Sequence, residues 1–223
     1  LRTALANDTL GPLKQLVEQI GIDQFWRTIE SLGLSGLSTP DGELLSAGGA
    51  ASPLDAAHAY SVFAQLGLRS GQRNPRSGQI EPVLVRSVRG LDGRVWYEHE
   101  TPETQAVLSQ PLAYLVHHIL SDEPARWPSL GYPNALEIGR PAGAKVARTT
   151  DGRSSWAAGY TPRHAAVVWI GAGGGTSEAV DPTLAAGVWG AILQHVEQDL
   201  PIENWPIPPG ITSMEVCETS GLL

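Results

Sequence analysis

The stretch GAKVARTTDGRSSWAAGYTPRHAAVVWIG, residues 143–171, contains three runs of strand-forming residues separated by two short turns. Asp151-Gly152 stands at the first turn and Thr161-Pro162-Arg163 at the second, and these residue types favour tight turns. Connections this short join antiparallel neighbours, because parallel strands need crossovers of a dozen or more residues. The stretch therefore predicts an antiparallel meander with strands at 144–150, 155–160 and 165–171.

Helices are predicted before the meander from the spacing of apolar residues. Residues 10–20 have one apolar face and end at a glycine, which is a common helix terminator. Asp23 is expected to be the N-cap of the next helix. Residues 36–52 are rich in glycine, serine and proline, which indicates a loop. A third helix is predicted over residues 53–67. Pro53 stands at its start, and proline is favoured at the first position of a helix.

The middle of the chain gives weaker patterns. Residues 69–77 are polar and basic, and we expect a loop there. Residues 83–99 carry two valine-rich or aromatic runs around Leu-Asp-Gly, which predicts a β-hairpin. A helix is expected after Pro102, with Pro111 as a kink inside it. Residues 123–141 are rich in proline and are interpreted as a connection.

A long helix is predicted from Pro182 onward. Its apolar face is expected to cover the sheet, and that face is formed by Leu184, Val188, Ala191, Ile192 and Val196. The order of elements predicts an α+β domain, an antiparallel sheet flanked by helices, over residues 1–200. Residues 201–223 are expected to be a proline-rich extension that leads out of the domain.

Composition excludes several classes of function. The formal net charge is -8 and the pI is near 5.2, which argues against nucleic acid as a partner because phosphate binding needs clustered Lys and Arg. No apolar run approaches the ~20 residues needed to span a bilayer. The single cysteine, Cys217, has no internal disulfide partner.

Because the chain starts with Leu1 and not Met, it is expected to be a piece of a longer protein.

A metal site is not expected. His117 and His118 precede Asp122 and Glu123, but adjacent helical residues point about 100° apart and the set has no ligand spacing typical of zinc. The glycine run at 173–175 also departs from the G-x-G-x-x-G dinucleotide pattern, and we interpret it as a connection between a strand and a helix. The sequence therefore predicts no cofactor.

Several segments, in their order, resemble the C-terminal part of the transpeptidase domain of class A, bifunctional penicillin-binding proteins. They are ASPLDAAHAYSVFAQLG at 51–67, LDGRVWYEH at 91–99, DGRSSWAAGYTPRHAAVVWIG at 151–171 and VCETSGLL at 216–223. Together they span almost the whole chain. The resemblance implies the fold of serine β-lactamases and D,D-transpeptidases, without the upstream segment that carries the nucleophile.

The family's chemistry rests on three motifs, and two are absent. Neither Lys14 nor Lys145, the only lysines, has a serine three residues earlier, so the chain contains no Ser-x-x-Lys. That motif supplies the nucleophilic serine and the lysine that helps to activate it. The Ser-x-Asn motif should fall at 8–10, where Asp8 and Leu10 occupy its two ends. The chain therefore offers no catalytic residue of its own.

The third motif, Lys-Thr-Gly-Thr, aligns without a gap with Lys145, Val146, Ala147 and Arg148. Only the lysine matches. Val146 has no hydroxyl, and Ala147 adds a methyl group where glycine would let a substrate lie against an edge strand. Arg148 brings a bulky cation to the position of a hydroxyl. These four residues, with Asp8 and Leu10, are the candidates for a degenerate substrate cleft.

Two functional interpretations remain open. The resemblance implies peptidoglycan stem peptides ending in D-Ala-D-Ala, and β-lactams, as ligands of a serine acyltransferase that needs no cofactor. It also implies an extracytoplasmic location, with the membrane anchor and possible glycosyltransferase in upstream parts of a parent protein. One interpretation is a fragment of such an enzyme that is inactive by itself. The alternative is a pseudoenzyme, a scaffold module that binds peptidoglycan or a partner through a remodelled cleft.

Overall fold

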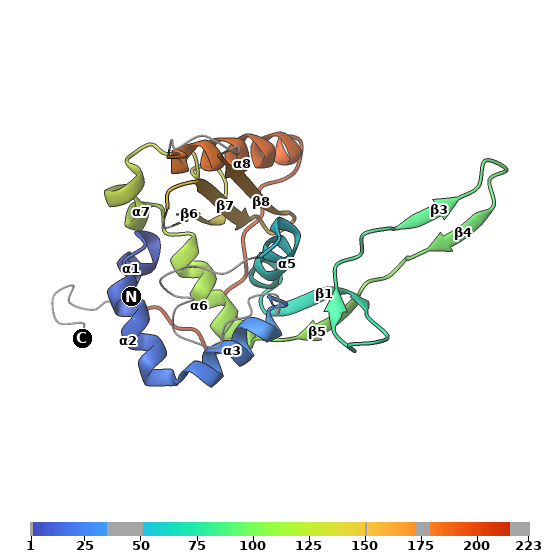
Figure 1. Cartoon of the computed structure of the whole chain (residues 1–223), viewed down its shortest axis with the longest axis horizontal. Helices are drawn as coiled ribbons and strands as arrows, with labels where there is room; N and C mark the ends of the chain where they lie inside the picture. The colour runs from blue at the N-terminus through green and yellow to red at the C-terminus, as the bar shows by residue number, and fades with distance from the viewer. Residues whose placement is uncertain (1, 35–50, 150, 173–178, 215–223) are drawn as a thin grey trace.

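A three-stranded antiparallel sheet with helices on both faces forms the body of the molecule (Figure 1). The computed structural model describes residues 2–34, 51–149, 151–172 and 179–214. Most of the predicted loop at 36–52, the glycine run at 173–175, Cys217 and the segment 216–223 lie outside the described residues. Among the described helices, none combines the length and apolar character that crossing a membrane requires.

The predicted meander is confirmed. Strands β6 (Gly143–Arg148), β7 (Ser154–Tyr160) and β8 (Ala165–Gly171) pair antiparallel in the order β6-β7-β8. The first turn is fixed by the Asp151 carboxylate, which accepts hydrogen bonds from Thr149 Oγ1 at 2.6 Å and from the Arg153 N–H at 2.9 Å. Gly152 in the same turn has φ of 69°, a conformation that favours glycine.

Helix α8 (Pro182–Glu197) covers one face of the sheet, but with a different side from the predicted one. The side chains expected in the core are exposed: Leu184, Val188, Ala191, Ile192 and Val196. The buried side instead carries Ala185, Ala186, Trp189, Gly190 and Leu193. A Cβ on Gly190 would lie 2.4 Å from the Ala135 carbonyl oxygen. Small residues on this side therefore allow α8 to lie close to the segment around Ala135, and the Trp189 side chain fills the remaining space beneath the helix.

Helices α5 (Pro53–Ala64) and α6 (Gln110–Leu120) lie on the opposite face (Figure 1). Tyr160 of β7 is fully buried there and stacks on Phe63, with ring centroids 6.4 Å apart. Trp205, from the predicted extension, is also buried and donates from its indole N–H to the Ala64 carbonyl at 2.7 Å. The predicted extension thus contacts the domain through Trp205, while most of the described residues around it are exposed.

Two predictions for the middle of the chain are wrong in part. Residues 69–73 of the predicted loop form strand β1 (Leu68–Arg73), which pairs antiparallel with β2 (Ile80–Glu81) and with β5 (Glu103–Ala106), and only the turn at 74–77 lies outside a strand. The helix predicted after Pro102 begins only at Gln110, because β5 occupies the first part of that segment. Helix α6 starts at Gln110, so Pro111 lies in its first turn and causes no kink. Pairing with distant strands determined these structures, and the local polar composition gave no sign of it.

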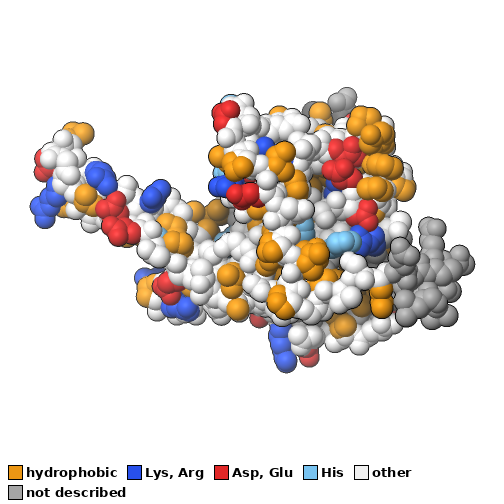
Figure 2. Space-filling model, turned by 180° about the vertical axis from the view of Figure 1, so that it is seen from behind, with side chains coloured by type: hydrophobic (Ala, Val, Ile, Leu, Met, Phe, Trp, Pro, Cys, Tyr) orange, Lys and Arg blue, Asp and Glu red, His pale blue; other side chains and the backbone are white. Residues whose placement is uncertain are grey.

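The predicted hairpin is confirmed in a shorter form, as β3 (Ser87–Arg89) paired with β4 (Val95–Glu98). It forms the end of an arm that stands away from the body and carries both basic and acidic side chains (Figures 1 and 2). Several large apolar side chains of this arm are exposed. Leu91 at its tip and Trp96 on β4 are two of them.

The N-terminal helices are α1 (Arg2–Ala6), α2 (Leu10–Ile20) and α3 (Ile22–Ser31). Helix α2 ends at Gly21 as predicted, and the Gly21 N–H donates to the Val17 carbonyl at 2.9 Å. Gly21 is also the N-cap of α3, so the assignment of Asp23 as N-cap is wrong and Asp23 lies in the first turn. There its carboxylate complements the positive end of the helix dipole. The connection predicted at 123–141 contains helix α7 (Glu123–Leu130).

Candidate functional site

Lys145 of β6 directs its side chain toward the junction of α1 and α2. Its ammonium group donates to the Leu5 carbonyl oxygen at 2.8 Å and to Asp8 Oδ1 at 2.5 Å. Leu5 lies in the last turn of α1, where carbonyls have no partner within the helix. Only 18% of the Lys145 side chain is exposed. Lys145 is therefore fixed by two acceptors and shielded from most of the solvent.

Asp8 stands in the turn between α1 and α2. Its φ is 54°, in the left-handed region that Asp and Asn tolerate better than most residues. The turn is closed by the Thr9 N–H, which donates to the Ala4 carbonyl at 2.9 Å. The Asp8 side chain remains 52% exposed. The structure thus brings together the residues aligned with the second and third family motifs.

Next to this pair lies a hollow of about 280 Å³. Its walls are mostly aliphatic, contributed by Leu5, Leu13, Leu16, Val116 and Ile119. The negative charge of Asp8 acts on the hydroxyl group of Tyr60, a residue of α5. Burial, and after it the negative charge of Asp8, raises the pKa of the Tyr60 hydroxyl to about 12. The phenol therefore stays protonated and cannot act as a base near neutral pH.

The other cleft candidates occupy different surroundings. Val146 lies on the opposite face of β6 from Lys145, because successive strand residues alternate, and it is buried in the core beneath α8. The missing hydroxyl at Val146 therefore does not bear on the cleft. Ala147 lies on the same face as Lys145, and Arg148 is exposed. Leu10 begins α2, but its side chain lies outside the described set.

Two further residues, Asn7 and Arg2, anchor α1 and were not singled out in the sequence. The Asn7 amide donates to the Thr3 carbonyl at 2.9 Å and to the Ala125 carbonyl at 2.7 Å. Arg2 forms an ion pair with Asp122 at 2.7 Å. These bonds hold α1 against α7 and the end of α6, and so position Leu5 and Asp8. No local pattern could have indicated them, since both partners lie more than 100 residues away.

The His117-His118 pair is structural. His117 is buried, and its ring centroid lies 3.9 Å from that of Trp205. Burial, and secondarily the neighbouring His118, lowers the pKa of His117 to about 4. His118 Nδ1 instead contacts the Arg2 guanidinium at 2.7 Å. Over the described part of the chain, no three His, Cys, Asp or Glu side chains gather in a way that could hold a metal ion.

The chain is similar to known proteins in sequence and in fold. No protein-family model matches the chain. Penicillin-binding protein 1A of Clostridium novyi is 30% identical over 167 residues, which are 75% of this chain and 18% of that protein. The crystal structure of penicillin-binding protein 1A from Haemophilus influenzae matches with a TM-score of 0.80 at 18% identity, over 100% of this chain and 38% of that one.

The chain belongs to the penicillin-binding proteins. Its fold is that of their transpeptidase domain, as the sequence predicted. A structure of penicillin-binding protein A from M. tuberculosis as an imipenem acyl-enzyme complex also matches, with a TM-score of 0.66 at 18% identity. That match covers 87% of this chain and 47% of the other. The chain thus spans less than half of each of these penicillin-binding proteins.

Proposed function

We propose that this chain is the transpeptidase-like part of a peptidoglycan-synthesis protein and that it performs no acyl transfer of its own. The observation that carries the proposal is the contact of the Lys145 ammonium with Asp8 and with the Leu5 carbonyl. Acyl transfer requires an activated nucleophile. No Ser-x-x-Lys is present in these 223 residues, and the lysine that marks the cleft is already bonded to a carboxylate.

The same contact defines what the cleft can still do. A carboxylate ligand would have to displace Asp8 from Lys145 or share the ammonium group with it. Asp8 is half exposed, so its carboxylate can turn into solvent when a ligand takes its place on Lys145, and the Leu5 carbonyl can still hold the ammonium group. Ala147 adds a methyl group to the same face of the edge strand. We therefore expect weak, reversible binding.

The ligand class follows from the family. Stem peptides ending in D-Ala-D-Ala present a terminal carboxylate, which suits the Lys145 ammonium. β-Lactams are the second ligand class, and the imipenem complex named above is an acyl-enzyme of a relative. The proposal includes an extracytoplasmic location, with membrane attachment through other parts of a longer protein. It also includes residues 1–200 as the domain proper.

A titration with a peptide that ends in D-Ala-D-Ala tests this function. Amide chemical shifts near Lys145 and Asp8 should change in a saturable way. Asp8→Asn should strengthen binding several-fold because it frees the ammonium group, and Lys145→Met should abolish binding. Asp23→Asn, on α3 and away from the cleft, should bind as the wild type does. If neither the wild type nor Asp8→Asn shows shifts that depend on the peptide, this cleft does not bind stem peptides.

The exposed arm favours a second candidate, a scaffold that binds a partner protein. An isolated two-stranded hairpin is marginally stable in water, and this one exposes Leu91 and Trp96. A photoreactive residue at position 91 in the full-length protein should capture a peptidoglycan-synthesis protein in the native cell. The same residue at the exposed position 18 of α2 should not. Equal capture from both positions would contradict a partner specific to the arm.

A further inference from the structure

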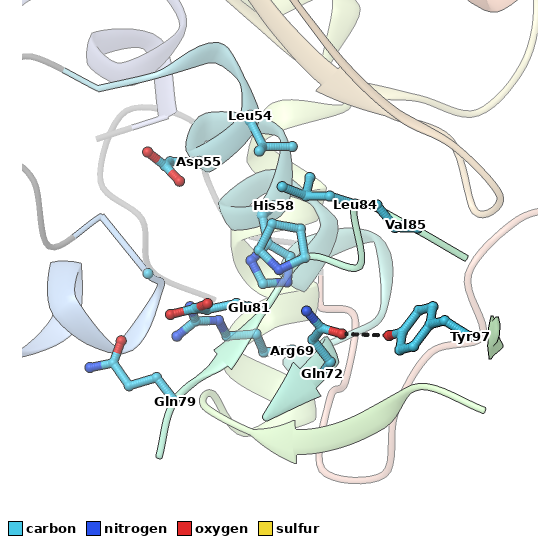
Figure 3. A pocket seen from close by; sticks show the side chains of 12 residues that line it. Leu54, Asp55, His58, Arg69, Gln72, Gln79, Glu81, Leu84, Val85 and Tyr97 are labelled. Atoms are coloured by element: carbon cyan, nitrogen blue, oxygen red, sulfur yellow. Dashed lines mark hydrogen bonds between the residues drawn. The ribbon is translucent and has the colours of Figure 1, made fainter. Parts of the chain in front are cut away.

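Three adjacent hollows lie at the base of the arm, away from the Lys145 cleft. The first has a volume of about 350 Å³ and is bounded by α5, β1, β2 and the root of the arm (Figure 3). The others have volumes of about 290 and 340 Å³. The first hollow shares Arg69 and Gln79 with the second, and Gln72 and Glu81 with the third. The first hollow therefore adjoins each of the other two, and the three together are here named the β1–β2 row.

Arg69 stands in the wall between the first two hollows with unused hydrogen-bond donors. It is only 5% exposed, and among the described residues its Nε has no partner. Its Nη1 reaches the Ser31 carbonyl at 3.4 Å, which is long for a hydrogen bond. Buried guanidinium groups normally have close partners, because an unsatisfied buried donor is costly. Arg69 thus lines both hollows as a cation whose own hydrogen bonds are incomplete, and its positive charge bears on both spaces.

Acceptors surround the same hollow (Figure 3). Glu81 Oε1 accepts from the Asn74 amide at 2.7 Å, and Asp55 Oδ2 accepts from the Ser52 hydroxyl at 2.7 Å. The second oxygen of each carboxylate remains available within the described residues. His58 Nε2 lies 2.8 Å from the Ser70 carbonyl oxygen, which can only accept. The neutral His58 ring therefore keeps its Nδ1 as a further acceptor.

An apolar strip borders these polar groups on the side of the arm. Leu84 and Val85 are 70% and 51% exposed and line the first hollow together with the Tyr97 ring. The Tyr97 hydroxyl donates to Gln72 Oε1 at 3.3 Å, which helps to fix that ring at the rim (Figure 3). The Gln79 side chain makes no hydrogen bond to any described residue. One wall of the first hollow is thus polar and the other apolar.

We propose that the β1–β2 row binds a polysaccharide strand, with one sugar unit in each hollow. A sugar hydroxyl both donates and accepts, so neighbouring hydroxyls can accept from Arg69 and donate to Glu81 at the same time. The C–H face of a pyranose ring can pack on Tyr97 and Leu84. A repeating ligand suits a row of similar hollows, which a single peptide terminus would not fill.

The charges of the row favour a neutral strand over a polyanion. Basic side chains of the three hollows are Arg27, Arg69, Arg73 and Arg76, and acidic ones are Asp55, Glu30 and Glu81. The carboxylates face the same space as the guanidinium groups, so a phosphate backbone would meet repulsion as well as attraction. Only the choice of sugar rests on the proposed function, which makes an N-acetylglucosamine-containing strand the natural probe.

The test uses N-acetylglucosamine oligomers of increasing length and the intact chain, with saturation-transfer NMR and a titration. Affinity should rise from the monomer to the trimer and then level off, because the row has three hollows. Gln79→Ala should weaken binding of the trimer about three- to tenfold, since one ligand hydrogen bond is lost. Gln194→Ala removes an exposed amide on α8 and should bind as the wild type does. Glu81→Gln is a second variant and should also weaken binding.

Several results would overturn the proposal. They are the absence of saturation transfer to every oligomer, affinity that does not grow beyond the monomer, and unchanged binding in both Gln79→Ala and Glu81→Gln. Displacement of the trimer by trialanine would assign the row to peptides instead. None of the residues invoked belongs to the Lys145 cleft, so failure of stem-peptide binding there would leave these outcomes unaffected. The two proposals are therefore separable.

Discussion

Lys145 and Asp8 stand 137 residues apart in the chain and form an ion pair with Nζ and Oδ1 2.5 Å apart. The pair joins the edge strand β6 to the turn between α1 and α2, and the Leu5 carbonyl completes it. We propose that this lysine marks a degenerate substrate cleft. Here its ammonium group is already neutralised by a carboxylate of the same chain.

Replacing Lys145 by methionine should lower the free energy of unfolding by about 1–2 kcal/mol, because the Leu5 carbonyl and the Asp8 carboxylate each lose a partner. Lys14 is the matched control, as the only other lysine and an exposed one. Lys14→Met should change stability by less than about 0.5 kcal/mol. Denaturant midpoints of the two variants give the comparison. Equal midpoints would mean that the Lys145 contacts add nothing to stability.

The reversed face of α8 predicts losses of stability of very different size at two adjacent positions. Leu193→Ala should cost about 2–5 kcal/mol, because Leu193 is 1% exposed and leaves a cavity beneath the helix. Ile192 is 42% exposed, so Ile192→Ala should cost less than about 1 kcal/mol. Chemical denaturation of both variants checks this. A larger loss from Ile192→Ala would restore the orientation expected from the sequence.

The sequence predicted the meander well because its three strands are consecutive and joined by short turns. Every pairing in that sheet is between neighbours along the chain, and Asp151-Gly152 carries its own turn chemistry. The side of α8 that faces the sheet could not be predicted as well. The helix has two apolar sides, and the side that is buried is the one on which Gly190 and Ala186 permit a close approach to neighbouring backbone.

Segments whose structure depends on distant partners were predicted poorly. Strand β1 is polar, and Gly71 within it lies so close to β2 that a Cβ would be 1.9 Å from the Glu81 carbonyl oxygen. Nothing near β1 in the sequence signals that approach. In the candidate site, too, some residues could be predicted from the sequence and others could not. Lys145 and Asp8 could be found by aligned motifs, whereas Leu5, Asn7 and Tyr60 enter the site only through the packing of α1 and α5.

Acid should destabilise the domain through His117. Burial and the neighbouring His118 lower the pKa of His117 from 6.5 to about 4, so the unfolded chain takes up a proton before the folded one does. The contribution of the neutral His117 ring to the free energy of unfolding is complete above pH 6.5. It is lost as the pH falls toward 4, by up to roughly 3 kcal/mol. His117→Gln should flatten this dependence, measured by denaturation between pH 7 and 4.

A control variant gives the comparison for this pH dependence. His195 is an exposed histidine near the end of α8, and His195→Gln should keep the acid sensitivity of the wild type. If His117→Gln loses stability between pH 6.5 and 4 as steeply as the wild type, another group is responsible.

Restoring the third motif should not restore the family's reaction. A variant that carries Val146→Thr, Ala147→Gly and Arg148→Thr recovers Lys-Thr-Gly-Thr but still has no Ser-x-x-Lys. Threonine at position 146 would also place a hydroxyl in the core beneath α8, which costs stability unless it finds a partner. We expect a lower melting temperature and no gain in reactivity toward a fluorescent penicillin on a denaturing gel. Labelling of this variant would show that the motif residues alone had limited the reaction.

The most direct test of the central claim is the intact mass of this chain after incubation with a β-lactam under conditions that acylate an active penicillin-binding protein. The account predicts an unchanged mass, because no activated serine accompanies the Lys145–Asp8 pair. A stoichiometric adduct on the wild-type chain would contradict it.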